Sequence, residues 1–407
     1  MWAPMHVLLD KKRRLTWIFL AILAILAAGS TIAGFMNALS HSQDFEWSPS
    51  RLLLWHQNPY RLYLDYTAGR LSENPFLKSQ LPLYPASGLI FLWPYAALPW
   101  RLAQISWATS NILFGFGSVF LVWKLYLADK RDIMILVMLL TLFLASTPYR
   151  ITVGNGQHGL FSMFFFLSAL YAERRGTRNL VALLLAVSWL KYSITVPLSL
   201  LFMRRDRIYT LLVAGGIDLA LTIFAARWTG SSVLDMLYQP ILVIRSGLAT
   251  GYIDLHSILK LAGVGNAMGF IVPALLGAIT LWIAIKRRPS DELLLASLLS
   301  LAASVMVVHL LYDFIVLLFP LTYAIRTWTD PRRSRMSAAL AVVFIAAIIP
   351  IWYLGRPIEA LYHVHPGLVS KLAMWLCWAW VVAGTYVALG FCSLVCIASA
   401  GPRRRPG

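Results

Sequence analysis

The chain alternates between long apolar segments and short polar segments, most of which are basic. Apolar segments of about 20 residues match the hydrocarbon core of a bilayer, which is about 30 Å thick. In lipid every backbone group must be satisfied within its own element, so these continuous segments predict membrane helices rather than the alternating strands of a barrel. The segments cover residues 15–37, 101–127, 132–148, 157–173, 208–227, 266–285, 291–310, 313–326, 336–354 and 371–398.

The composition supports this interpretation. Of the 407 residues, 59% are hydrophobic and only 13% are charged, whereas soluble domains carry about 25% charged residues. The net charge of +18 could indicate a nucleic-acid partner. However, the basic residues form short clusters between apolar segments, so we expect no nucleic-acid partner. The three cysteines, Cys377, Cys392 and Cys396, all fall in the last apolar segment and suit neither a disulfide framework nor a metal site.

The basic clusters predict the topology, because cytoplasmic loops are enriched in lysine and arginine. About two thirds of the 35 basic residues lie in these clusters. If the clusters are cytoplasmic, both termini are inside, and residues 38–100, 149–156, 228–265, 309–313 and 355–370 are outside. The first segment, from Leu15 to Met36, is too long for a signal-peptide core, so we expect a retained helix. The clusters are Lys11–Arg14, Lys124 with Lys130–Arg131, Arg174–Arg178, Arg204–Arg207, Lys286–Arg288, Arg326–Arg335 and Arg403–Arg405.

Two apolar segments do not fit a simple count of crossings. Residues 83–100 are rich in proline, and a full crossing there would move every later basic cluster to the wrong side, so we expect a juxtamembrane helix on the outer side. Residues 179–203 lie between two basic clusters and contain Lys191 and Pro197. A hairpin of two short helices that turns near Lys191 satisfies both observations, and irregular backbone at that depth indicates a cavity.

The predicted fold is therefore an all-α polytopic membrane protein. It has about ten full crossings, a broken-helix hairpin and outer juxtamembrane helices. We expect one integral membrane domain over residues 1–407, with a core at 15–330 and a C-terminal helix pair at 331–407. We also expect a monomer in the inner (plasma) membrane, in contact with membrane lipids.

Asp44 and Glu46 follow the first apolar segment by a few residues, which places two carboxylates near the outer interface. Such a carboxylate is either a catalytic group or a helix cap or solvated loop charge. Ser48 followed by Pro49 is the better helix start, because serine is a favoured N-cap and proline is favoured at the first helical position. We therefore expect the next helix to begin there, without Asp44 as its cap.

Three further outer segments contain polar or aromatic groups. The sequence Asn58-Pro59-Tyr60 and the proline- and aromatic-rich residues 81–85 are more typical of turns and interfacial aromatics than of chemistry. Residues 154–159 include Gln157 at the predicted start of a helix, where backbone N–H groups can bind an anion. A tight glycine turn explains these residues equally well.

Several ionisable residues lie in or beside apolar segments. Lys191 is costly at its depth and marks a functional site by default; it could pair with a phosphate, or its ammonium could reach the outer interface. His309 and Asp313 are four residues apart and share a face if the helix continues, whereas a capped turn is the alternative. Asp218 is an isolated carboxylate to which we assign no role.

The inner loops are too short to form a nucleotide-binding domain. There is no P-loop, and residues 154–156 lack the strand–turn–helix context of a dinucleotide-binding motif. Any group transfer would take place on the outer side, where nucleotide-activated donors are normally absent. A donor would therefore have to arrive attached to a lipid.

The order and spacing of these motifs resemble those of family-87 glycosyltransferases of the GT-C superfamily. The resemblance covers about residues 15–330. It departs from the usual pattern at His56, where glycine is usual, and at His158-Gly159, where an asparagine is usual. It is carried by Asp44-Phe45, Asn58-Pro59-Tyr60, Tyr84-Pro85, Trp107, Pro148, Gly156-Gln157, Leu190-Lys191, His309 and Tyr312-Asp313.

The resemblance implies a GT-C-like bundle that transfers a sugar, usually mannose or a pentofuranose, from a polyprenyl-phosphate donor to a lipid or glycan acceptor outside the cytoplasm. It implies that Asp44 is the general base and that His309 belongs to the active site. In-line displacement by the acceptor hydroxyl would invert the anomeric centre. No cofactor and no metal are expected, because no cluster of carboxylates suits a metal ion. The candidate substrate-binding residues are Lys191, Gln157, Arg150, Tyr60, Tyr312 and Asp313.

Two other functions compete with this one. A transporter or a flippase for lipid-linked sugars also suits a polytopic bundle with a broken hairpin, but it predicts inverted repeats and several deep charges, and the sequence contains no convincing repeat. A non-catalytic assembly subunit would not need Asp44 and His309 to face one cavity. An arrangement of Asp44, Lys191 and His309 around one outward cavity would favour the glycosyltransferase.

Overall fold

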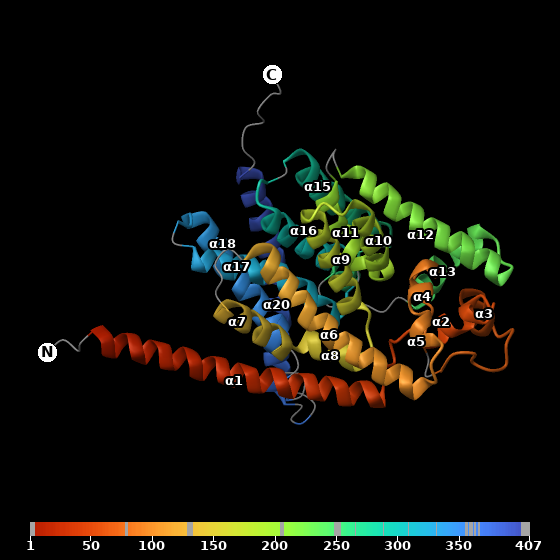
Figure 1. The fold of residues 1–407 in the computed structure, drawn as a ribbon, viewed down its shortest axis with the longest axis horizontal. Helices are drawn as coiled ribbons and strands as arrows, with labels where there is room; N and C mark the ends of the chain where they lie inside the picture. The colour runs from red at the N-terminus through yellow and green to blue at the C-terminus, as the bar shows by residue number, and fades with distance from the viewer. Residues whose placement is uncertain are drawn as a thin grey trace, which may run out of the picture.

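The computed structural model shows an all-α protein, and the described residues contain no β-strand. The all-α membrane class predicted from the apolar segments is confirmed. Figure 1 shows a bundle of helices with α1 (Met5–Ser40) lying along one side and extending beyond the rest at its N-terminal end. The structure describes residues 5–399 except 78–79, 128–132, 204–206, 248–253, 265, 288, 308, 331, 355–356, 358–360, 362–363 and 365–366.

The helices vary widely in length, and length decides which can cross a bilayer. The longer ones besides α1 are α6 (Trp100–Tyr126), α12 (Ile208–Thr229), α15 (Asn266–Lys286), α18 (Arg335–Ile349) with its π-helical extension η6 (Pro350–Leu354), and α20 (Leu368–Ser399). Helices of intermediate length are α7 (Ile133–Ala145), α8 (Thr147–Asn155), α9 (Gly159–Arg174), α10 (Arg178–Ser188), α13 (Val233–Gly247), α16 (Glu292–Met306) and α17 (Leu318–Thr329). The short ones are α2 (Trp47–Leu54), α3 (Pro59–Thr67), α4 (Ala86–Phe91), α5 (Trp93–Ala96), α11 (Tyr192–Leu198), α14 (Leu255–Leu261) and the 3-10 helices η3 (Trp189–Lys191), η4 (Ser199–Phe202) and η5 (Leu311–Leu317).

Fewer helices are long enough to cross a membrane than the sequence suggested. Among the described residues, six helical segments are long and apolar enough, or seven if α7 and α8, which are bent by 58° to each other, form one span. The predicted count of about ten crossings is therefore not confirmed. Helix α16 shows one reason, since its 15 residues are shorter than a full crossing and nearly all are buried against protein.

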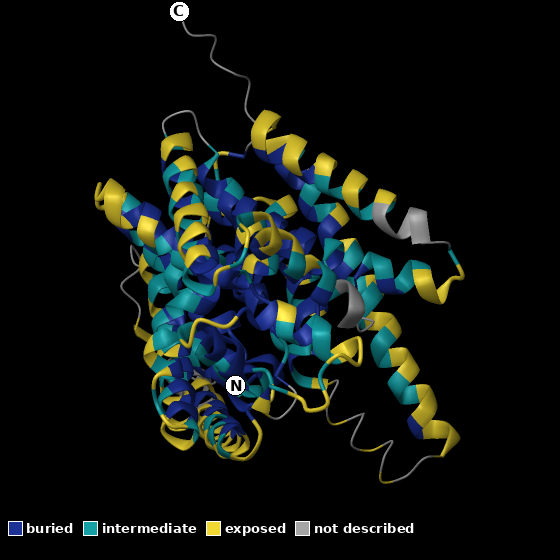
Figure 2. Cartoon of the chain, turned by 90° about the vertical axis from the view of Figure 1, so that its right-hand side faces the viewer, coloured by how far each residue is buried: buried dark blue, intermediate teal, exposed yellow. Residues whose placement is uncertain are grey.

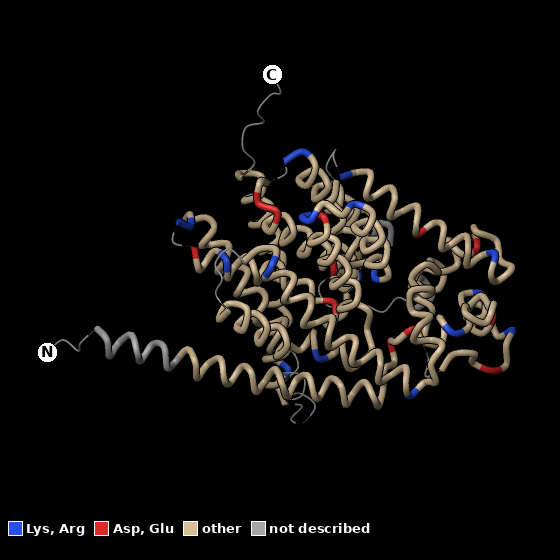
Figure 3. The backbone as a smooth tube through the Cα atoms, in the orientation of Figure 1, with Lys and Arg blue, Asp and Glu red and all other residues tan. Residues whose placement is uncertain are grey.

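The outer helices present apolar side chains away from the protein core. Helix α1 carries no charged residue between Thr16 and Ser40, as Figure 3 shows for its described length. Ile25 on α1 is 72% exposed and Leu368 on α20 is 82% exposed. In Figure 2 such exposed positions line the outward faces of the peripheral helices, while the buried residues gather at the centre. An apolar surface of this extent is typical of helices that contact lipid.

The predicted hairpin near Lys191 is supported by contacts between its two halves. The segment from Arg178 to Phe202 is long and apolar enough to form a single span. However, the indole Nε1 of Trp189 donates to Ser199 Oγ at 2.9 Å, although ten residues of straight α-helix would separate them by about 15 Å. The chain therefore turns back near Lys191, where the backbone leaves helical geometry (φ −105°, ψ 73°).

Both ends of this hairpin lie at the same end of the bundle. Arg207, just after it, forms an ion pair with Glu173, just before it, at 2.9 Å. Arg174 pairs with Glu292 at 3.0 Å, and Tyr126 at the end of α6 donates to the same carboxylate. Basic clusters that are distant in sequence therefore meet at one end, as the positive-inside pattern predicted. The basic positions Lys130, Arg131, Arg204, Arg205, Arg288 and Arg403–Arg405 lie outside the described residues.

The opposite end of the bundle is built by α2 to α5. Helices α4 and α5 have six and four residues, too few to cross, so the prediction that residues 83–100 do not span the membrane is supported. Trp47 Nε1 and Arg51 Nη1 both donate to the carbonyl of Leu98, at 3.1 and 3.0 Å. Arg101, directly after the apolar segment, also donates to the carbonyl of Leu39 at 2.6 Å, so residues before and after the segment lie on one side.

The predicted helix start at Ser48-Pro49 is wrong. Helix α2 begins at Trp47, and Glu46 occupies the N-cap position without a side-chain cap bond. Ser48 is instead bound in a tertiary contact, because its Oγ accepts the N–H of Leu77 at 2.9 Å. A long-range partner has therefore replaced local capping, although Asp44 is still not needed as the cap.

The side of the membrane on which these ends lie can be tested with cysteine labelling. In a variant whose three native cysteines are replaced by alanine, we expect single cysteines at Glu73 and Arg101 to react with a membrane-impermeant maleimide from the same side. A cysteine at Arg332, at the basic end, should react only after permeabilisation. Labelling of positions 73 and 101 from opposite sides would show that residues 83–100 cross. Lys78, which lies closer to residues 83–100 and would also suit this test, is outside the described residues.

Candidate active site

The site is centred on the turn of the hairpin, which positions Lys191. The break in the helix frees the backbone N–H of Lys191, which donates to Ser162 Oγ on α9 at 3.0 Å. Helix α4 packs against the same turn, since a Cβ on Gly88 would lie 2.6 Å from Leu190 Cδ1. The lysine side chain is thereby directed into the protein and is only 4% exposed. The alternative in which its ammonium reaches the interface is wrong.

The ammonium of Lys191 is held by three partners from three parts of the chain. Its Nζ lies 2.7 Å from Asp313 Oδ1 and 2.8 Å from Gln157 Oε1. The hydroxyl of Tyr84 lies 3.4 Å away, and the ring of Tyr312 lies beneath it at 4.7 Å. An ammonium has three donors, so each has an acceptor within reach. A buried charge is stable only when it is paired and hydrogen-bonded in this way.

Asp313 connects Lys191 to His309. Its second oxygen, Oδ2, lies 3.0 Å from His309 Nδ1 and accepts the backbone N–H of Leu310 at 3.3 Å. The helix does not continue between His309 and Asp313, because the backbone at Leu310 is extended. The pair therefore forms across a turn that begins η5, which was the alternative to a shared helix face. His309 Nε2 is buried and has no hydrogen-bond partner among the described residues.

Gln157 connects the same network to Asp44. Its Oε1 accepts from Lys191 and from the Tyr84 hydroxyl at 3.2 Å, so its amide N–H groups remain to donate to the carboxylate of Asp44. Asn155 also hydrogen-bonds this carboxylate through its side chain, and its carbonyl accepts the backbone N–H of Asp44 at 2.9 Å. A continuous polar chain thus runs from Asp44 to His309.

Opposing effects act on the pKa of the Asp44 carboxylate. Burial raises the pKa of Asp44 above its usual 3.8, while hydrogen bonds from Gln157 and Asn155 and the charge of Lys191 act in the opposite direction. The residue is only half-buried, so it remains accessible to a substrate. A raised pKa brings an aspartate closer to the range in which a general base is effective near neutral pH.

Aromatic packing fixes the segment that carries Asp44. The ring of Phe45 is stacked on Trp107 with centroids 5.0 Å apart and an interplanar angle of 2°. Trp107 Nε1 donates to the carbonyl of Gly156 at 2.8 Å. Gly156 has a φ of +73°, and a Cβ there would lie 2.8 Å from Phe45 Cβ. Only glycine suits this turn, which ends α8 and places Gln157 beside Asp44.

Glu46 supports the other side of the site. It is 2% exposed, and its Oε1 accepts the N–H of Leu83 at 2.8 Å, which holds the segment that carries Tyr84. Burial raises the pKa of Glu46 well above 4.5, and the nearby charge of Asp44 adds to this. Tyr60 anchors the same segment, because its hydroxyl donates to the carbonyl of Tyr84 at 2.6 Å. Glu46 and Tyr60 therefore position Tyr84.

This geometry can be compared with known proteins. The family model of glycosyltransferase family 87 matches residues 83–312, more than half of the chain. The chain belongs to glycosyltransferase family 87. No curated protein and no solved structure matches it. As a family-87 chain with several apolar helices, it is an integral membrane glycosyltransferase.

The family-87 match covers only part of the site. Gln157, Lys191 and His309 lie within it, as do Arg150 and Tyr312. Asp44, Tyr60 and Asp313 lie outside the matched residues, so their assignment depends on the contacts described above. The resemblance expected over residues 15–330 is therefore supported over a shorter range.

The structure brings together most of the candidate residues of this glycosyltransferase. Lys191, Gln157, Asp313 and His309 are in direct contact, and Asp44 joins them through Gln157. Tyr312 lies under Lys191. Tyr60 is one step removed, behind Tyr84. Arg150 lies on α8, where its carbonyl approaches Gly34 of α1.

Two contacts were not expected from the sequence. Tyr84, attributed to interfacial aromatics, touches both Gln157 and Lys191. His158, expected near an anion at a helix start, is fully buried; its ring packs on Tyr84 at 4.7 Å and on Trp107 at 5.1 Å. Asp218, on α12, lies next to Ser87 of α4. Within the described part of the chain, no three histidine, cysteine or acidic side chains could hold a metal ion.

The ion pair between Lys191 and Asp313 predicts a specific stability effect. Lys191→Met leaves the Asp313 carboxylate buried without its cation, so the free energy of unfolding should fall by about 3–5 kcal/mol. Adding Asp313→Asn removes that charge and should restore at least half of the loss. The measurement is unfolding of the purified protein in detergent.

The exposed ion pair between Arg70 and Asp65 provides the control. Arg70 is 63% exposed, so Arg70→Met should cost less than about 1 kcal/mol. Purely additive losses for Lys191→Met and Asp313→Asn would contradict a coupled buried pair.

Proposed function

We propose that this protein transfers a sugar, mannose or a pentofuranose, from a polyprenyl-phosphate donor to a lipid or glycan acceptor on the non-cytoplasmic face of the plasma membrane. The observation that supports this most directly is the buried polar chain from the half-buried Asp44 through Gln157 and Lys191 to His309. Membership of family 87 supplies glycosyl transfer as the reaction class.

In the proposed reaction Asp44 takes the proton of the acceptor hydroxyl. The hydroxyl oxygen forms a bond to the anomeric carbon while the bond from that carbon to the phosphate oxygen breaks, and polyprenyl phosphate leaves on the opposite side. The anomeric centre is inverted. Gln157 and Asn155 orient the Asp44 carboxylate, and a base positioned in this way contributes about 10²–10⁴-fold to the rate.

The phosphate side of the proposed site begins at His309. Its Nε2 is buried and lacks a partner among the described residues, so it can donate to a phosphate oxygen when protonated. Lys191 can bind a phosphate oxygen directly only if that oxygen replaces one of its three present acceptors. With or without direct contact, its positive charge acts on the phosphate at short range. Fixed donors and charges of this kind stabilise the negative charge that grows on a leaving group. Arg150 is a further candidate for this side.

The proposed sidedness follows from the two ends of α6. Its first turn packs near Trp47 and Phe45, beside Asp44, and its last turn reaches the basic end at Glu292. The 27 residues of α6 span about 40 Å, enough to cross the hydrocarbon core. With the basic end and both termini in the cytoplasm, Asp44 faces the periplasm or exterior.

The proposed base can be tested by removing its charge alone. Asp44→Asn keeps the shape of the side chain and should lower the transfer rate about 10²–10⁴-fold, with donor affinity unchanged. Transfer is measured by mass spectrometry with purified protein, polyprenyl-phosphate-linked mannose or pentofuranose, and lipid and glycan acceptors.

Glu46→Gln is the matched control for Asp44→Asn. The raised pKa of Glu46 favours a neutral side chain, which glutamine imitates, and glutamine keeps an oxygen for the N–H of Leu83. Transfer should therefore change little. Near-full transfer by Asp44→Asn together with loss of transfer in Glu46→Gln would assign the base to Glu46 instead of Asp44. Full transfer by both variants would contradict the mechanism.

The pH dependence of transfer gives a second test. Because burial raises the pKa of Asp44, its basic form is lost at a higher pH than for an exposed aspartate. The rate should fall as the pH is lowered through this raised pKa, measured as kcat/KM from about pH 8 to about pH 4. The residual activity of Asp44→Asn should lack this acidic limb. An identical limb in both proteins would assign it to another group.

A further inference from the structure

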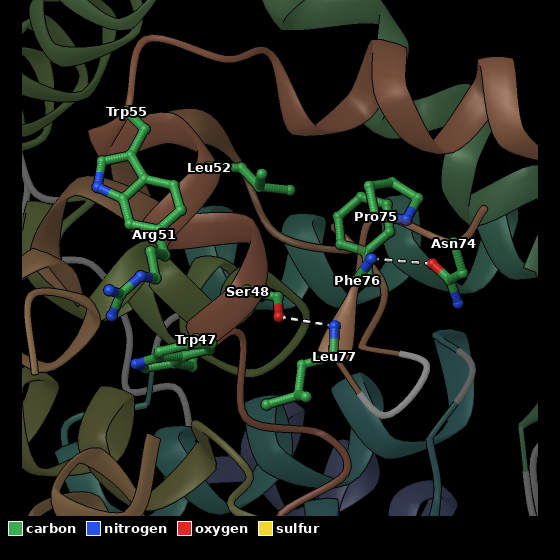
Figure 4. A pocket seen from close by; sticks show the side chains of 9 residues that line it. All are labelled: Trp47, Ser48, Arg51, Leu52, Trp55, Asn74, Pro75, Phe76 and Leu77. Carbon is green, nitrogen blue, oxygen red and sulfur yellow. Dashed lines mark hydrogen bonds between the residues drawn. The ribbon is translucent and has the colours of Figure 1, made fainter. Parts of the chain in front are cut away.

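A recess lies close to the proposed base. It has a volume of about 320 Å³, within the size range of small-molecule sites. Figure 4 shows helix α2 on one side and residues 74–77, which follow α3, on the other, joined by the hydrogen bond between Leu77 N–H and Ser48 Oγ. Its lining residues are Trp47, Ser48, Arg51, Leu52, Trp55, Asn74, Pro75, Phe76 and Leu77.

Two tryptophans and an arginine form one wall of this recess. The guanidinium of Arg51 lies 4.8 Å from the centre of the Trp47 ring and 4.4 Å from that of the Trp55 ring, so it sits between the two indoles (Figure 4). Arg51 Nη1 is held by the carbonyls of Ala96 and Leu98. The guanidinium is thus fixed in place with planar donors to offer to a ligand.

The surface chemistry of the wall combines aromatic area with fixed polar groups. Trp55 is 56% exposed, although a large indole gains stability from burial. Its exposure is not explained by packing within the described chain. Asn74 is also exposed, and its Oδ1 already accepts the N–H of Phe76 at 2.9 Å. Exposed indole, guanidinium and amide groups together suit a sugar, whose C–H faces stack on aromatic rings while its hydroxyls form hydrogen bonds.

The recess is also close to the site of transfer. Trp47 is three residues from Asp44, so their Cα atoms are at most about 11 Å apart. The two are linked by packing as well, since the Trp100 ring lies 6.1 Å from Phe45 and 5.4 Å from Trp47. A short oligosaccharide can cover this distance. A sugar in the recess could therefore belong to the same molecule as the hydroxyl that Asp44 deprotonates.

We infer that the recess between α2 and residues 74–77 binds the saccharide part of the acceptor. The bound part is one or more sugars adjoining the sugar that carries the reacting hydroxyl. The inference deepens the proposed function and rests on it for the role of the bound sugar, while the binding itself does not require transfer. It assigns an acceptor that already carries a glycan, rather than a bare lipid alcohol. Trp55 supplies the stacking surface, and Arg51 supplies the fixed donors.

The experiment measures saccharide binding directly by saturation-transfer NMR on the full-length protein in nanodiscs. The probes are an α-linked mannotriose and an α-linked arabinofuranotriose. Trp55→Ala should weaken binding of at least one of them about tenfold, and Trp55→Phe, which keeps an aromatic face, should recover most of that loss. Trp375→Ala is the control, because Trp375 is 60% exposed on α20, far along the chain from the recess.

Each outcome decides for or against the inference. No saturable binding of either trisaccharide, or equal affinity in wild type and Trp55→Ala, overturns it. If Trp55→Ala instead lowers only the affinity for vesicles of anionic phospholipid, the tryptophan is a membrane anchor and the inference fails. Asp44→Asn should bind the trisaccharides like wild type. If Asp44→Asn retains full transfer while Trp55→Ala weakens trisaccharide binding, Asp44 is not the base, but the recess is still a saccharide-binding site.

Discussion

The structure depends on one buried ion pair, between Lys191 and Asp313. Removing two charges from water costs several kcal/mol for each ion, and the cost is offset only by close pairing and additional hydrogen bonds. Those bonds come from Gln157 and His309, which lie on separate segments. Each of these segments leaves regular helix where it contributes its side chain. The irregular turns of the bundle are therefore coupled to each other through the charge of Lys191.

Much of this arrangement could be predicted from the sequence, because hydropathy and charge clusters are local signals. They indicated the helices, the reversal at Lys191 and the polar groups at Gln157 and His309. The number of crossings could not be predicted, since apolarity alone does not distinguish a helix buried by protein, such as α16, from one buried by lipid. The helix start at Ser48 and the role of Tyr84 were missed because both depend on partners distant in sequence.

Two positions in the chain have a left-handed backbone for different reasons. Gly156 has a left-handed conformation against Phe45, and no larger residue fits. His56 has a φ of +62°. Its ring stacks on Trp228 with centroids 3.9 Å apart, and its Nδ1 lies 3.0 Å from the carbonyl of the same tryptophan. The space around His56 is open, so its side chain can pack on α12. This contact offsets the strain of the positive φ.

The buried ion pair also has a consequence during biosynthesis. Asp313 follows Lys191 by about 120 residues, so at about 5–20 residues per second the ribosome needs roughly 6–24 s to supply it. During that interval the hairpin carries an ammonium that has no carboxylate partner from η5. Because an ammonium at that depth is costly in lipid, we expect the hairpin to stay in the translocon or in a hydrated position until the later helices emerge. Completion of the site is therefore a late event in the maturation of the chain.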